Sequence, residues 1–326
     1  MLGMALLSLA SRRIVVLTLA LGVGALALPA SGSAAAVAVA PTVGTGGVSH
    51  VSFSSAILSG DVNAQGAATN YYFQYGTTSA YGSQTPLAPA GNGTITIKVS
   101  QTITGLLAAT VYHYRVLAVS PSGTTVGGGR TFTTAKIPLS VQLVATPNPV
   151  VFGDSFYVEG TLSGTGAADH AIALQVNPFP YLRGFQTVGN LELTSATGGF
   201  SFPYLGLLEN AQLRVVTVGS PVVSSPIVIE SVAVRVSFRV HSTGRRGYAR
   251  LYGTVAPAEV GALVGFQLLT PGKSTNEGGT VLKAGTSTVS SFSRTVRIKH
   301  PGLYRALVLV NDGAHVFNYS APILIR

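Results

Sequence analysis

The stretch "GLLAATVYHYRVLAV" (residues 105–119) decides how the rest of the sequence is interpreted. Its Tyr-His-Tyr-Arg run contains residue types that also occur in active sites. Every second residue of the run is nevertheless apolar or aromatic, a set made up of Tyr112, Tyr114, Val116 and Ala118. Side chains alternate between the two faces of a β-strand. The pattern therefore predicts a strand whose tyrosines face a core, while His113 and Arg115 point outward.

The composition extends this prediction to the whole chain. Of the 326 residues, 47% are hydrophobic and only 9% are charged, and there are 39 Gly and 17 Pro. Gly and Pro interrupt helices, whereas the Val, Thr, Ile, Tyr and Phe between them favour strands. At ~100–200 residues per domain, the length suits two or three domains. We predict an all-β protein.

The motifs around residues 105–119 occur in a recognisable order. Leu106, Thr110 and Tyr112 keep the spacing of a tyrosine corner, in which a Tyr hydroxyl bonds backbone upstream. With "AILSGDVNAQG" (56–66), "YYFQYGTTSAYG" (71–82), "TITGL" (102–106) and "GGGRTFTT" (127–134), residues 48–136 resemble bacterial fibronectin type III-like domains. Ala64 and Ala108 stand where that family often has Pro. The resemblance implies a spacer and interaction module without catalytic residues.

An internal repeat follows. "FYVEGTL" (156–162) parallels "ARLYGTV" (249–255), "IALQ" (172–175) parallels "VGFQ" (264–267), and "SPIVI" (225–229) parallels "APILI" (321–325). Nearly constant offsets between such matches are typical of two related domains. Residues 137–230 and 231–326 both resemble the Ig-like domains of bacterial secreted proteins. The resemblance implies two further sandwiches and concerns the fold only.

The N-terminus has the composition of an export signal. Arg12 and Arg13 precede an apolar run (14–28) and the small residues "PASGSAAA" (29–36). This order is that of a secretory signal peptide, which we place at residues 1–36 as a helix. An uncleaved membrane anchor is the alternative, although the run is short for a span of about 20 residues. We expect residues 37–47 to be a linker, and the protein to be extracellular or at the cell surface.

The sequence offers little for chemistry. Cys is absent, and the ten Asp and Glu are scattered. The six histidines show no H-x-x-x-H or H-E-x-x-H spacing, and no nucleophile or phosphate-binding motif occurs. We therefore assign no catalytic, cofactor-binding or metal-binding residue, expect no cofactor, and predict that the protein is not an enzyme.

One loop concentrates aromatic side chains. "NPFPYLRGF" (177–185) contains Phe179, Tyr181 and Phe185 between Pro and Gly residues. Exposed, they could stack on sugars or on a partner protein. The alternative is that they fold back onto the end of their own sandwich, since exposed apolar patches are uncommon.

Charge is concentrated in the last domain. Residues 229–326 hold twelve Lys and Arg against four Asp and Glu, whereas residues 137–228 hold two against five. A positive field attracts anionic polymers such as acidic polysaccharides. General solubility and protection of edge strands are the alternative. The candidate residues are Arg235, Arg239, Arg245, Arg246, Arg297 and Lys299.

These observations favour a non-enzymatic exported protein that acts in structure, adhesion or interaction at the surface or outside the cell. The alternative is a polysaccharide- or cell-wall-binding accessory module that works with a separate hydrolase. The expected partner is an extracellular or cell-wall polymer or a surface protein. Nucleic acid is disfavoured because no recognition fold is evident, and a membrane would be contacted only through an uncleaved signal segment.

Overall fold

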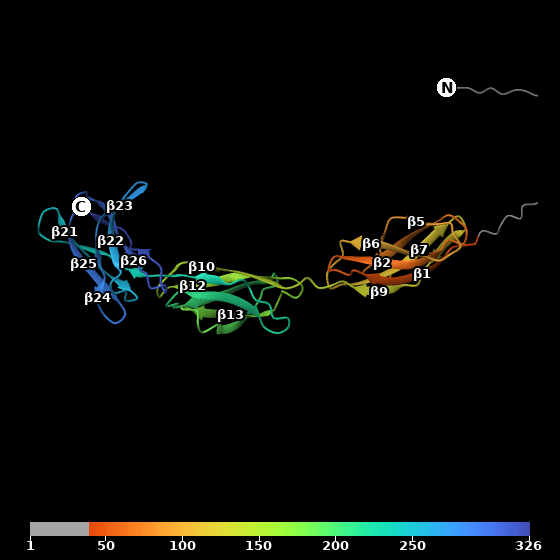
Figure 1. Ribbon diagram of the computed structural model, residues 1–326, viewed down its shortest axis with the longest axis horizontal. Coiled ribbons are helices and arrows are strands. Elements are labelled where there is room, and N and C mark those ends of the chain that lie inside the picture. Colours follow the sequence, from red (N-terminus) through yellow and green to blue (C-terminus); the bar gives the residue numbers. More distant parts are fainter. Residues whose placement is uncertain (1–38) are drawn as a thin grey trace, which may run out of the picture.

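The computed structural model describes residues 39–326, and these residues contain strands and no helix. Figure 1 shows them as an elongated row of β-sandwiches, with an extended connection after the first and direct contact between the second and third. The predicted fold class, all-β with tandem β-sandwiches of the fibronectin type III and Ig-like kind, is confirmed. The predicted signal-peptide helix at 1–36 lies outside the described residues.

The first sandwich is formed by residues 42–133. Its strands are β1 (Thr42–Ser49), β2 (Ser55–Asn63), β3 (Thr69–Gly76), β4 (Ser83–Gln84), β5 (Ala88–Gly91), β6 (Ile97–Thr104), β7 (Val111–Ser120), β8 (Gly123–Val126) and β9 (Arg130–Thr133). One sheet has the order β1–β2–β6, and the other has the order β4–β3–β7–β8, with β5 on β3 and β9 on β7. All pairings are antiparallel, and the side chains between the two sheets form one hydrophobic core.

Strand β7 is the strand predicted from residues 105–119. Tyr112, Tyr114 and Val116 are buried in the core, whereas the side chains of His113 and Arg115 lie on the other face of the sheet. The tyrosine corner is also present, because the Leu107 backbone N–H donates to the Tyr112 hydroxyl at 3.0 Å.

The predicted linker at 37–47 is wrong for residues 42–47, which belong to β1 and pair with β2. Thr45 is buried, and its hydroxyl accepts the Val116 N–H. The segment has no visible apolar alternation because small residues occupy it. At Gly46 a Cβ would stand 2.8 Å from the Ser59 carbonyl oxygen, so glycine, with no Cβ, is what lets the two strands approach.

The second sandwich is formed mainly by residues 140–230. Its strands are β10 (Ser140–Thr146), β11 (Val150–Val151), β12 (Ser155–Ser163), β13 (Ala171–Pro178), β14 (Gln186–Leu193), β15 (Gly199–Leu205), β16 (Ala211–Thr217) and β17 (Val228–Glu230). Its sheets have the orders β10–β12–β15 and β14–β13–β16–β17, and they enclose a second core.

The third sandwich follows the same plan. Its strands are β18 (Val232–Ala233), β19 (Arg235–Val236), β20 (Arg239–Ser242), β21 (Tyr248–Ala256), β22 (Leu263–Thr270), β23 (Lys273–Val281), β24 (Lys283–Ala284), β25 (Ser290–Arg297), β26 (Gly302–Leu309), β27 (Asn318–Tyr319) and β28 (Ile323–Ile325). One sheet runs β19–β21–β25–β24 with β20 also on β21, and the other runs β23–β22–β26–β27 with β28 on β26. A third core lies between them.

The repeated residues occupy equivalent positions in the second and third sandwiches. At Gly160 a Cβ would meet the Gln142 carbonyl and the Phe200 ring, and at Gly253 it would meet the Ser237 carbonyl and the Phe292 ring. In both places the glycine admits a neighbouring strand and an aromatic ring that a side chain would exclude.

A glutamine–arginine pair recurs in all three sandwiches. The arginine Nε donates to the glutamine amide oxygen at 2.8 to 2.9 Å, and each guanidinium also stacks on an aromatic ring. The pairs are Arg115–Gln74, Arg214–Gln175 and Arg305–Gln267. Each pair joins the two central strands of one sheet, so the three sandwiches share a common construction.

We predict that Tyr112→Phe lowers the free energy of unfolding of the first sandwich by ~0.5–1.5 kcal/mol, because the Leu107 N–H loses its acceptor. His113→Ala is the control, expected to change stability by less than about 0.5 kcal/mol because its side chain points outward. Chemical denaturation followed by tyrosine fluorescence measures both. An equal or larger loss in His113→Ala would contradict the assignment of β7.

Candidate functional site

The outer face of the sheet β19–β21–β25–β24 carries several exposed cations of the third sandwich. Leu251 and Phe292 point into the core, so the residues that alternate with them face solvent. We define the basic face by the four cations at outward positions of four strands: Arg239, Arg250, Lys283 and Arg297. No Asp or Glu occurs in residues 235–256 or 283–309. The strands that form the face therefore contribute no negative charge to it.

Part of the basic face is hollowed beside Arg239 and Arg250. Strand β25 contributes Ser291 and Ser293 at outward positions next to Tyr252 and Thr254 of β21. These residues, with Arg239 and Arg250, line a groove of about 430 Å³. The Arg250 guanidinium lies 5.5 Å from the centre of the Tyr252 ring, and its Nε donates to the Ser293 hydroxyl at 2.7 Å. Short hydroxyl side chains form the floor, and arginines stand beside it.

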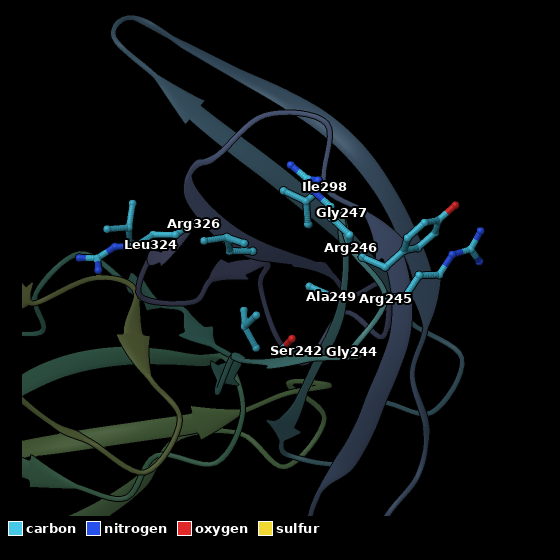
Figure 2. Close-up of a pocket in the computed structure, with 12 residues that line it drawn as sticks. Ser242, Gly244, Arg245, Arg246, Gly247, Ala249, Ile298, Leu324 and Arg326 are labelled. Atoms are coloured by element: carbon cyan, nitrogen blue, oxygen red, sulfur yellow. The ribbon is translucent and has the colours of Figure 1, made fainter.

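A second group of arginines lies at one end of the same sandwich. Figure 2 shows Arg245, Arg246 and Arg326 around a pocket of about 360 Å³ whose wall includes Ile298 and Leu324. The Arg245 guanidinium stacks 4.0 Å from the centre of the Tyr248 ring. The "GRRG" arginines are thus exposed close to the edge of the basic face, and Lys299 is exposed just after β25.

Arg235 has a different role from the other sequence-predicted cations. Its Nη2 contacts Asp154 Oδ1 at 2.5 Å, and its Nε and Nη2 both donate to the Phe152 carbonyl. Both partners belong to the second sandwich. Arg235 therefore connects two sandwiches, whereas the sequence analysis grouped it with Arg239 as a candidate for binding an anionic polymer.

The aromatic side chains of the loop at 177–185 pack against other parts of the protein. None of Phe179, Tyr181 and Phe185 is fully exposed. The Phe179 ring packs on Gly313 of the third sandwich and edge-on against Tyr181. The Arg214 guanidinium covers Phe185 at 4.1 Å. The loop offers no open aromatic platform, and part of it contacts the third sandwich.

The second and third sandwiches meet at a joint, which we define as residues 148–154, 208–210, 231–235 and 312–316. The segment 231–234 lies at its centre. On one side β18 pairs in parallel with β11 of the second sandwich, and on the other Ala233 bridges to Val316. Apolar residues alternate from Val232 to Val240 in the sequence, but the structure divides this segment into β18, β19 and β20, and β18 belongs to the joint.

Two buried polar side chains satisfy backbone groups at the joint. Asn210 Oδ1 accepts the Val232 N–H at 2.7 Å, and its Nδ2 donates to the Gly313 carbonyl at 3.0 Å. Glu230 is fully buried and accepts the Val150 N–H at 3.0 Å. Burial raises the pKa of Glu230 to about 7, and the hydrogen bond from Val150 only partly opposes this.

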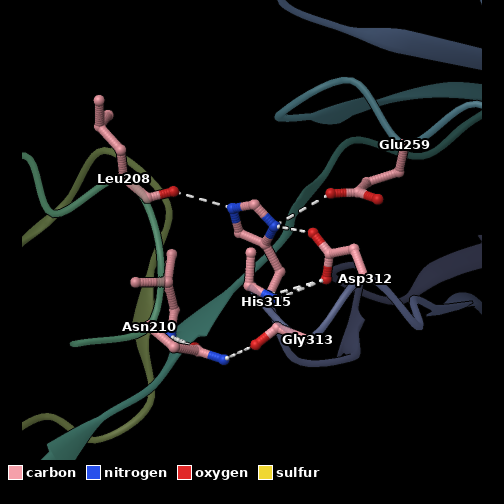
Figure 3. Close-up of polar contacts among 8 residues, drawn as sticks. Leu208, Asn210, Glu259, Asp312, Gly313 and His315 are labelled. Atoms are coloured by element: carbon pink, nitrogen blue, oxygen red, sulfur yellow. Dashed lines mark hydrogen bonds and ion pairs between the residues drawn. The ribbon is translucent and has the colours of Figure 1, made fainter. Parts of the chain in front are cut away.

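His315 lies at the edge of the joint between two carboxylates and a backbone carbonyl, as Figure 3 shows. Its Nδ1 is 2.6 Å from Asp312 Oδ2 and 3.1 Å from Glu259 Oε1, and its Nε2 is 2.8 Å from the Leu208 carbonyl oxygen. The imidazole is 9% exposed and the Glu259 side chain 12%. This cluster was missed, because Glu259 is remote in sequence, and only the three-residue spacing of Asp312 and His315 hints at it.

The two carboxylates of this cluster have opposite pKa shifts. Burial, followed by the charge of Asp312, raises the pKa of Glu259 above its usual value. Burial alone would also raise the pKa of Asp312. Hydrogen bonds from the His315 ring and from the His315 and Ala314 backbone outweigh it, so the pKa of Asp312 is lowered. Of the two neighbouring carboxyl groups, Glu259 is therefore the one that is harder to ionise.

No family model matches the chain, and no curated protein matches it. Similar solved structures include domains from titin, 14% identical over 87% of this chain and 98% of that chain at a TM-score of 0.39. FN domains of chicken CNTN1 are 12% identical, over 87% of this chain and 98% of that chain, at a TM-score of 0.27. A tetra-tandem repeat from the extending region of a large adhesion protein is 15% identical, over 87% of this chain and 74% of that chain, at a TM-score of 0.28. The assignment of the fold rests on the strands and sheets described above, and these similarities add nothing on ligand or activity.

Within residues 39–326, no helix has the length and apolar character needed to cross a membrane.

We predict that Asn210→Ala lowers the free energy of unfolding of the joined second and third sandwiches by ~1–3 kcal/mol, because the buried Val232 N–H loses its acceptor. Asn190→Ala, at an exposed position of β14, is the matched control and should change stability by less than about 0.5 kcal/mol. Calorimetric unfolding compares them. Equal transitions in the two variants would show that Asn210 does not hold the joint.

Proposed function

We propose that the protein is an exported, non-enzymatic interaction protein of the cell surface or extracellular space, and that its basic face binds an anionic polymer. One observation carries the proposal. Four cations from four neighbouring strands face outward, two of them, Arg239 and Arg250, line a groove, and the strands that form this face contain no acidic residue. Stability of a β-sandwich does not require such an excess of one charge.

The geometry suits an extended chain better than a compact ligand. Neighbouring strands lie ~4.8 Å apart and outward residues repeat every ~6.8 Å along a strand. The cations of the sheet are therefore spread over its surface at these spacings and do not converge on one point. The short Ser291 and Ser293 side chains leave room for a polymer to approach Arg239 and Arg250. Serine and threonine hydroxyls both donate and accept hydrogen bonds, as contact with sugar hydroxyls requires. An acidic polysaccharide is therefore the polymer class that we favour.

The cations predicted from the sequence fall into two groups, those on or near the basic face and one at the joint. Arg239 and Arg297 belong to the basic face, with Arg250 and Lys283 added, and Arg245, Arg246 and Lys299 extend it towards the end of the sandwich. Arg235 is assigned to the joint because Asp154 and the Phe152 carbonyl bind its guanidinium. Phe179, Tyr181 and Phe185 are left out of the proposed site because their rings pack on other parts of the protein.

We predict that the protein binds polygalacturonate at low salt and loses most of this binding at high salt, because exposed charges are screened over ~8–10 Å at physiological ionic strength. The triple variant Arg239→Glu, Arg250→Glu, Arg297→Glu should bind at least about tenfold more weakly, equivalent to ~1.4 kcal/mol. Binding is measured by biolayer interferometry at both salt concentrations.

The control for this experiment is Arg130→Glu, Lys136→Glu, Lys273→Glu, which changes the net charge by the same amount at exposed positions away from the basic face. It should retain nearly full binding. Equal losses in the two variants, or affinity that does not respond to salt, would refute a binding role for the basic face and leave its charge to solubility.

A further inference from the structure

The hydrogen-bonding partners of His315 restrict its protonation. The Leu208 carbonyl oxygen 2.8 Å from Nε2 can only accept a hydrogen bond, so Nε2 carries hydrogen. Nδ1 faces Asp312 Oδ2 and Glu259 Oε1, which also only accept when ionised. A neutral ring would therefore direct its Nδ1 lone pair at two negative oxygens. A single cation among the three atoms, either a proton or a metal ion, would satisfy all of them.

The three atoms form a suitable ligand set for a metal. One ligand atom each from Glu259, Asp312 and His315 lie within 4.8 Å of one another. Zn²⁺ binds imidazole nitrogen at ~2.0–2.1 Å and carboxylate oxygen at ~2.0–2.2 Å, which places ligand atoms roughly 3.3 Å apart around a tetrahedral ion. Small changes of side-chain torsion reach this separation from the observed distances of 2.6 and 3.1 Å.

The groups around the three side chains are also arranged as they are around a bound metal ion. Metal-binding histidines usually donate their second ring N–H to a carbonyl or carboxylate, which fixes the ring and its tautomer, and Leu208 provides that acceptor. The backbone N–H groups of Ala314 and His315 donate to Asp312 Oδ1 and leave Oδ2 directed at the ring. A pocket of about 380 Å³ lined by Glu259 and Asp312 gives solvent access for a water as fourth ligand.

We propose that Glu259, Asp312 and His315 bind a divalent transition-metal ion of the zinc class. All three ligands belong to the third sandwich, whereas the carbonyl that fixes the ring belongs to the second. A bound ion polarises the imidazole and strengthens its N–H donation to Leu208. The metal therefore stabilises the joint, a role separate from polymer binding by the basic face.

The test is titration of the chelator-treated protein with Zn²⁺ by isothermal calorimetry, together with the melting temperature with and without Zn²⁺. We expect one ion per chain and a higher melting temperature, since a ligand that binds only the folded state stabilises it. Glu259→Gln should weaken binding at least tenfold, the lower end of losses seen even for outer-shell changes (~10–100-fold), and should abolish the thermal shift.

Glu192→Gln, an exposed carboxylate on β14, is the matched control and should bind Zn²⁺ as the unaltered protein does. Glu259→Gln removes one of two adjacent negative charges, so without metal it should melt no lower than the unaltered protein, which shows that it folds. Absence of stoichiometric binding would mean that a proton is the cation in the cluster. Equal binding by both variants would place the ion elsewhere. Either result overturns the proposal, and neither affects the polysaccharide assay, which contains no metal.

Discussion

Packing between two sheets through alternating side chains is the constraint on which the whole structure depends. The chain has no cysteine, so disulfides cannot hold the sandwiches, and each core relies on apolar residues that occupy every second position of its strands. Once the inward positions are committed to a core, the outward positions are free to differ. The third sandwich uses this freedom to carry cations on one sheet without disturbing the packing beneath them.

The two connections between sandwiches differ in kind. After the first sandwich the chain continues through an extended segment, where Ile137 exchanges hydrogen bonds with Thr165 of the second sandwich. The second and third sandwiches instead share a short parallel pairing, the Asn210 contacts, the Arg235–Asp154 ion pair and the hydrogen bond between His315 and the Leu208 carbonyl. The buried hydrogen bond from the Val232 N–H to Asn210 is costly to break. The basic face is thereby held in one orientation relative to the second sandwich.

Sequence patterns predicted the features that depend on local periodicity. The alternation in β7 located the core of the first sandwich and the tyrosine corner, and Gly160 and Gly253 identified a real structural repeat. The start of β1 escaped prediction because small residues mask its alternation. The joint could not be predicted, since residues about 80 to 105 positions apart form it: Arg235 with Asp154, and Asn210 with Gly313. The basic face was found only in part, because Arg250 and Lys283 join it through strand pairing.

We propose the outer face of the third sandwich as the binding surface. Hydrogen–deuterium exchange of the full protein with and without polygalacturonate tests it most directly, since it locates the contact without altering the chain. Polymer bound at the basic face should slow exchange in β20, β21 and β25, with no change in β13, β14 or the aromatic loop at 177–185. Protection confined to that loop or to the first sandwich, with β20, β21 and β25 unchanged, would show that the polymer binds elsewhere.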